Sequence, residues 1–83
     1  MKHAHVQALF GSAVRLQRKQ LGFSQTELAA RSGLHRTYIS DVERGARNLS
    51  LQSIAVLAEA LQVSIPALFQ PVATEPKTPR RRN

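Results

Sequence analysis

The chain has 83 residues, and its 12 Lys and Arg against five Asp and Glu give a formal net charge of +7, which predicts attraction to a polyanion. One domain of this size has a core too small for a deep enzyme pocket, so we expect no enzyme activity and no small-molecule substrate. There is no cysteine to form a thiolate metal site, and we expect no metal or other cofactor. No apolar run reaches transmembrane length and the N-terminus lacks a signal-peptide core, so we expect a cytoplasmic protein without a membrane partner.

The first predicted element is a helix over residues 6–21, in which apolar side chains recur at mostly helical spacing. Gly11 is expected to be a weak point of this helix, because glycine in a helix interior lowers stability. Gly22 follows the helix, and a glycine there can take the left-handed conformation that ends a helix. We therefore expect a sharp turn before the next element.

Two short helices joined by a tight turn are predicted between Ser24 and Gly45. Ser24 can cap the first of them, and Glu27 can reach back to the amide of Ser24 and so complete a capping box. Gly33 breaks this helix, because the sharp turn needs a positive φ. Apolar residues three apart then form the inner face of the next helix. A helix-turn-helix in a chain of positive charge predicts sequence-specific DNA binding.

Two more helices are predicted in the C-terminal half. Ser50 can cap a fourth helix over residues 51–62, whose apolar residues again recur at helical spacing. Ser64 can cap a fifth, short helix, and Pro66 suits its first turn. With no strand of useful length, the sequence predicts an all-α domain over residues 1–70.

The last segment, residues 71–83, differs in composition from the rest of the chain. It holds three prolines, four basic residues, one acidic residue and one large apolar side chain. So little apolar surface cannot offset the entropy lost on ordering the chain. We expect a disordered basic tail that adds a net charge of +3.

When Gln25 is counted as the first position of a helix-turn-helix motif, the residues at the motif's core positions are Leu28, Ala29, Gly33, Leu34, Ile39 and Val42. This pattern resembles the Cro/phage-repressor helix-turn-helix family, and the resemblance covers roughly residues 6–70. Ser32 departs from the family pattern, since a small apolar residue is more usual there. The run LHRTYISDVERGARNLS most resembles the small controller proteins of restriction–modification systems, which are DNA-binding transcription regulators.

The resemblance implies a five-helix, repressor-like fold in which the second and third helices form the helix-turn-helix. It also implies an internal ion pair between Arg18 and Glu43, which would join the first helix to the third. Losing one partner of such a pair leaves the other charge stranded. We assign these two residues to structure and not to DNA contact.

The third helix is expected to read DNA bases, because the N-terminal residues of the recognition helix face the major groove. Arg36 can donate two parallel hydrogen bonds to guanine, and Thr37 can donate one or place its methyl group against thymine. Ser40 lies one helical turn beyond Arg36 on the same exposed face. These three residues are our candidates for base reading.

Phosphate contacts are expected on both sides of the base-reading residues. Gln25 opens a helix, where its side chain, the free amides and the helix dipole favour an anion. His35, at the expected N-cap of the third helix, can cap that helix or contact a phosphate. The Tyr38 hydroxyl can bond a phosphate, or its ring can pack against the first helix. The remaining candidates, which follow the third helix, are Arg44, Arg47 and Asn48.

Asp41 is an acidic residue on the helix expected to face DNA. Its carboxylate can accept a hydrogen bond from cytosine, or it can orient Arg36 or Arg44. It can also simply weaken nonspecific binding by repelling phosphates, and we favour this role or the orienting one over the contact with cytosine.

A homodimer on a palindromic operator is expected, because one reading helix covers too few base pairs to specify a genomic site. The C-terminal helices carry more apolar residues than the small core can absorb, so part of them should form a self-complementary patch. Val63 and Ile65 are expected at its centre, because the turn before the fifth helix must expose one of them. The full set of candidate interface residues is Leu49, Leu51, Val63, Ile65 and Phe69.

The predicted function is therefore a transcription regulator that binds double-stranded DNA as a homodimer. The alternative is an antitoxin, or another protein-interaction module that contains a helix-turn-helix domain.

Overall fold

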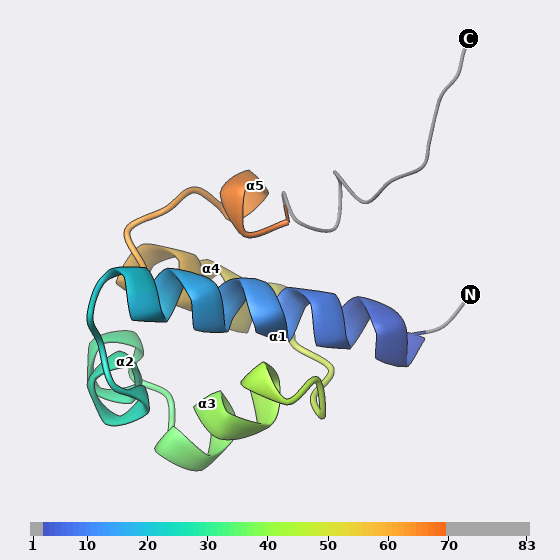
Figure 1. The fold of residues 1–83 in the computed structure, drawn as a ribbon, viewed down its shortest axis with the longest axis horizontal. Coiled ribbons are helices and arrows are strands. Elements are labelled where there is room, and N and C mark those ends of the chain that lie inside the picture. Colours follow the sequence, from blue (N-terminus) through green and yellow to red (C-terminus); the bar gives the residue numbers. More distant parts are fainter. Residues whose placement is uncertain (1–2, 70–83) are drawn as a thin grey trace, which may run out of the picture.

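The computed structural model describes residues 3–69. Five helices make up this part of the chain, and Figure 1 shows how they are arranged. They are α1 (His3–Gln20), α2 (Gln25–Ser32), α3 (Arg36–Glu43), α4 (Leu51–Ala60) and α5 (Ile65–Leu68). The described residues contain no strand, which confirms the predicted all-α, five-helix architecture. None of these helices is long and apolar enough to span a membrane. The predicted tail, residues 71–83, lies outside the described residues.

The starts of three helices follow from serine caps. The Oγ of Ser24 accepts a hydrogen bond from the amide of Glu27 at 3.0 Å, and Ser50 and Ser64 cap α4 and α5 in the same way. Each bond satisfies one of the free amides at a helix start. The second arm predicted for the capping box is replaced by another contact, because the Glu27 carboxylate accepts from Nε of Arg31 at 2.9 Å.

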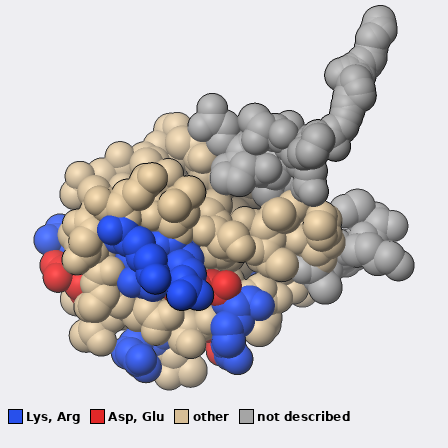
Figure 2. All heavy atoms as spheres, in the orientation of Figure 1, with Lys and Arg blue, Asp and Glu red and all other residues tan. Residues whose placement is uncertain are grey.

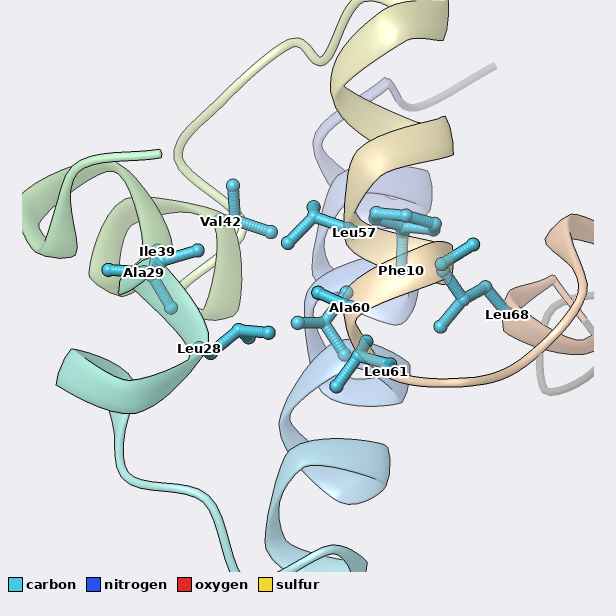
Figure 3. Close-up of a cluster of buried hydrophobic side chains, with 11 residues drawn as sticks. Phe10, Leu28, Ala29, Ile39, Val42, Leu57, Ala60, Leu61 and Leu68 are labelled. Atoms are coloured by element: carbon cyan, nitrogen blue, oxygen red, sulfur yellow. The ribbon is translucent and has the colours of Figure 1, made fainter. Parts of the chain in front are cut away.

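The core lies where the helix-turn-helix meets the rest of the domain. Helix α3 packs on α1 and α2, and α4 packs on α2 and α5. Figure 3 shows Leu28 of α2 and Val42 of α3 turned toward Leu57 of α4 and toward Leu61. These four side chains are at most 1% exposed, and each contributes about 1.5–3 kcal/mol by burial. The core therefore fixes the helix-turn-helix on the other helices.

The crossing of α1 and α3 depends on Gly11, which is buried between them. A Cβ placed on Gly11 would lie 2.2 Å from the carbonyl oxygen of Val42. This oxygen belongs to the backbone of α3, which cannot move aside as a flexible side chain could. The expectation that Gly11 is merely a weak point of α1 is corrected here, since the missing side chain lets the two helices approach closely.

The turn between α2 and α3 has the conformation that the sequence predicts. Gly33 adopts a φ of +78°, and its amide donates to the carbonyl of Ala29 at 2.9 Å. Ser32, which departs from the family pattern, is half-buried beside this turn. Its hydroxyl donates to the Ala29 carbonyl and accepts from the Leu34 amide, each at 3.3 Å. A polar side chain is tolerated there because its hydrogen-bonding groups are satisfied.

Candidate nucleic-acid interface

A buried ion pair sets the position of α3. Arg18 of α1 and Glu43 of α3 meet in the pairing that the family resemblance implies, with Nε–Oε2 at 2.6 Å and Nη2–Oε1 at 3.0 Å. Their side chains are 10% and 4% exposed. The hydrogen bond with Glu43 raises the pKa of Arg18 above its usual value. Arg18 also donates through Nη1 to the carbonyl of Phe23 at 2.8 Å, so one guanidinium ties three segments together.

Gln25, a candidate for phosphate binding, takes part in the same network. Its Nε2 donates to Oε1 of Glu43 at 3.1 Å, and its side chain is half-buried at the start of α2. The side chain therefore also links α2 to α3. The side-chain amide of Gln25 has a second N–H, and the first backbone amides of α2 lie beside it, so a phosphate can still bind there. The phosphate contact of Gln25 stays a prediction.

The three candidate base-reading residues lie together on α3. Arg36 and Thr37 are exposed, and Ser40 is half-buried one turn further along. Ile39 and Val42, on the opposite side of the helix, are buried in the core. No carboxylate in residues 3–69 forms an ion pair with Arg36, so its guanidinium donors face solvent. This face of α3 therefore presents hydrogen-bonding groups outward on a helix that the core holds in place.

A second polar group lies at the C-terminal end of α3. The Asp41 carboxylate accepts from Nη2 of Arg44 and, at 3.3 Å, from Nε of Arg47. The hydrogen bond from Arg44, and after it that from Arg47, hold the pKa of Asp41 below its usual value. The guanidinium of Arg47 also stacks 4.8 Å from the centre of the Tyr38 ring. Asp41 thus contacts Arg44, one of its two predicted partners, and also Arg47, which the sequence does not predict.

Three other candidates for phosphate contact occupy defined places. Tyr38 is half-buried and packs against the core, and packing of its ring on the first helix, one of its two proposed roles, stays a prediction. His35 is the N-cap of α3 by its backbone, but its ring makes no capping hydrogen bond, so the proposed capping role of the ring is wrong. The side-chain oxygen of Asn48 accepts from Nε2 of Gln7, which holds the loop after α3 against α1.

Two basic residues that the sequence analysis does not single out extend the positive surface. Figure 2 shows Lys and Arg gathered over the C-terminal half of α1. Arg15 and Lys19 are exposed on this helix one turn apart, and α1 contains no acidic residue. The signal was present in the sequence, since both lie opposite the apolar face of the helix.

The five candidate interface residues divide into two groups. Leu51 is 85% exposed and Ile65 is 43% exposed, so both can take part in an intermolecular contact. Of the two residues expected at the centre of the patch, Ile65 is therefore the more exposed. The other three are only partly exposed and pack against the core, and they are Leu49, Val63 and Phe69.

Comparison with known proteins identifies the class to which this fold and surface belong. The model of the helix-turn-helix family matches residues 14–68, so the chain belongs to this family. Within the family it is similar to control protein C.SmaI of Serratia marcescens, with 44% identity over 64 residues that cover 77% of this chain and 76% of that protein. These findings confirm the resemblance stated from the sequence.

Two solved structures are similar in fold as well as in sequence. The restriction–modification controller protein C.AhdI of Aeromonas hydrophila matches with a TM-score of 0.75 and 46% identity, over 76% of this chain and 96% of that one. The controller protein C.Esp1396I, solved as a tetramer in complex with its natural 35 base-pair operator, matches with a TM-score of 0.75 and 32% identity. That match covers 82% of this chain and 90% of the other.

Proposed function

We propose that this chain is a transcription regulator that binds a defined sequence of double-stranded DNA, in the manner of restriction–modification controller proteins. The observation that carries the proposal is the exposed face of α3, where Arg36 and Thr37 present free donors. Such donors on a rigidly held helix are what reading of the major groove requires. The chain thus acts by binding and not by catalysis, and we place it in the cytoplasm, where it meets DNA.

Phosphate contacts position the reading helix on the duplex. Gln25 lies at the start of α2, and Arg44 and Arg47 lie beyond the other end of the motif, so the reading residues are flanked on two sides. Contacts on both sides of a groove fix the register of a protein on DNA without carrying sequence information. The remaining proposed phosphate contacts are His35, Tyr38 and Asn48.

A homodimer is the proposed binding unit. Leu51 on α4 and Ile65 on α5 are exposed and provide apolar surface. Neither residue belongs to α3, the helix proposed to read DNA. A two-fold axis through this surface would place two copies of α3 in successive major grooves, about 34–36 Å apart. The relative C.Esp1396I binds its operator as a tetramer, which supports assembly of this chain on DNA.

The test is selection of bound sites from a random duplex pool, using the full chain. We expect enrichment of a near-palindromic sequence with two half-sites one helical turn apart. A scrambled duplex of the same composition is the control for nonspecific binding. Failure to enrich any sequence, with affinity that depends only on salt, would contradict the proposal and favour a protein-interaction module.

A further inference from the structure

Asp41 lies between two arginines at the C-terminal end of α3 and contacts both. One carboxylate oxygen accepts from Arg44, and the other accepts from Nε of Arg47 at 3.3 Å. The planar guanidinium of Arg47 lies over Tyr38, with its central carbon 4.8 Å from the ring centre. Arg47 is therefore held on one edge by a carboxylate and on one face by an aromatic ring.

The atoms that Arg47 leaves unused define what the arrangement can do. Only Nε is engaged by Asp41, and the two terminal amino groups have no hydrogen-bond partner among residues 3–69. The side chain is 46% exposed, so these groups can reach a ligand. Two parallel donors of a guanidinium match two oxygens of a phosphate.

We propose that Asp41 is a positioning residue, which holds Arg47 against Tyr38 so that the terminal amino groups of Arg47 are preset to bind one DNA phosphate. This inference rests on the proposed function, because it concerns how the same surface binds DNA. Arginine is long and flexible, and ordering it at an interface costs free energy. A side chain that is already ordered in the free protein avoids much of that loss.

The opposite role for Asp41 makes the opposite prediction. If the carboxylate only repels phosphates, its removal strengthens binding to every duplex, because the protein gains one unit of positive charge. If the carboxylate positions Arg47, its removal weakens binding to the operator in spite of that gain. The sign of the change therefore separates the two roles.

The first experiment measures the affinity of the full chain for the selected operator and for a scrambled duplex over a range of salt concentrations. Asp41→Ala is compared with Glu59→Ala, which removes an exposed acid from α4 and makes the same change in net charge. We expect Asp41→Ala to weaken operator binding about three- to tenfold. We expect Glu59→Ala to leave operator binding at the wild-type level or slightly tighter.

The second experiment asks whether Asp41 acts through Arg47. Arg47→Ala should lower the salt dependence of operator binding by about one phosphate contact. In the Arg47→Ala background, Asp41→Ala should cause no further loss, whereas in the Arg44→Ala background its effect should persist. In the free protein, NMR relaxation of the Arg47 Nε–H group should show greater mobility in Asp41→Ala than in wild type.

Three results would overturn the inference. They are tighter binding of Asp41→Ala to both duplexes, an undiminished effect of Asp41→Ala in the Arg47→Ala background, and unchanged mobility of Arg47 in the free variant. Failure of the proposed function looks different, because the wild-type chain itself would then show no preference for the operator over the scrambled duplex.

Discussion

The carboxylate of Glu43 on α3 accepts two hydrogen bonds from the guanidinium of Arg18 on α1, in a site where both side chains are nearly inaccessible to solvent. The two residues are 25 positions apart in the chain, so their pairing fixes the angle between two helices. Because α3 carries the candidate base-reading residues, a structural ion pair sets the direction in which the proposed DNA-reading face points.

Removing one partner of this pair should destabilise the domain strongly. Glu43→Ala leaves the buried Arg18 charge without compensation, and we expect a loss of about 3–5 kcal/mol in the free energy of unfolding. Glu27→Ala breaks an exposed pair with Arg31, each side chain 46% exposed, and should cost about 0–1 kcal/mol. Urea unfolding followed by circular dichroism, at one fixed protein concentration, measures both. Equal midpoints for the two variants would show that the Arg18–Glu43 pair contributes no more than a surface contact.

The close crossing of α1 and α3 predicts an unusual response to alanine. Gly11→Ala should destabilise the fold by about 1–3 kcal/mol, because its Cβ would meet the backbone of α3. At an exposed helix position the same change would stabilise by up to about 1 kcal/mol. Ser12→Ala, exposed on the same helix, is the matched control and should stay within about 0.5 kcal/mol of wild type. A higher melting temperature for Gly11→Ala would disprove the steric argument.

Arg36 should contribute to sequence preference and not only to affinity. Arg36→Ala is expected to cost roughly 1–3 kcal/mol on the selected operator and to relax the preference at one base pair. Arg15→Ala, which removes an exposed arginine from α1, should leave base preference unchanged. Fluorescence anisotropy with operator and scrambled duplexes tests both variants. An equal loss for Arg36→Ala on the two duplexes would make it a phosphate contact.

Dimerisation should depend on the exposed apolar residues of α4 and α5. Ile65→Asp places a charge in the proposed interface, so we expect a folded monomer that binds the operator far more weakly. Leu16→Asp is the control, since Leu16 is 51% exposed on α1, outside the proposed interface. Sedimentation equilibrium decides between these outcomes. A wild-type chain that stays monomeric at high micromolar concentration, and binds one half-site as tightly as two, would rule out the dimer.

The basic C-terminal segment should add a sequence-independent contribution to binding. Residues 71–83 carry four basic residues and one acidic residue. Deleting them should flatten the dependence of operator affinity on salt, by about one unit of slope for each lost phosphate contact, while base preference stays the same. Affinity measured from low to high salt tests this. If the deletion prevents folding or dimerisation, the segment has a structural role instead.

Much of this domain could be predicted from local sequence because the relevant forces are local. Ser24, Ser50 and Ser64 cap helices through bonds to amides three residues away, so a short window contains both partners. The requirement for Gly33 is also local, because it concerns only the backbone of that residue, whose φ is +78°. The exposure of Arg36 follows from the helical repeat once the buried side of α3 is known.

Other features depend on how the helices and the loop after α3 pack in three dimensions, so only the tertiary structure decides them. The sequence marks Gly11 as a weak helix residue, whereas the backbone of α3 beside it makes the missing side chain a requirement for packing. Asp41 and Arg47 meet because the chain turns back after α3, and the Tyr38 ring then supports the arginine from a different side. Local sequence therefore determined the helices and the exposure of the candidate reading residues, and tertiary packing determined which side chains hold those residues in place.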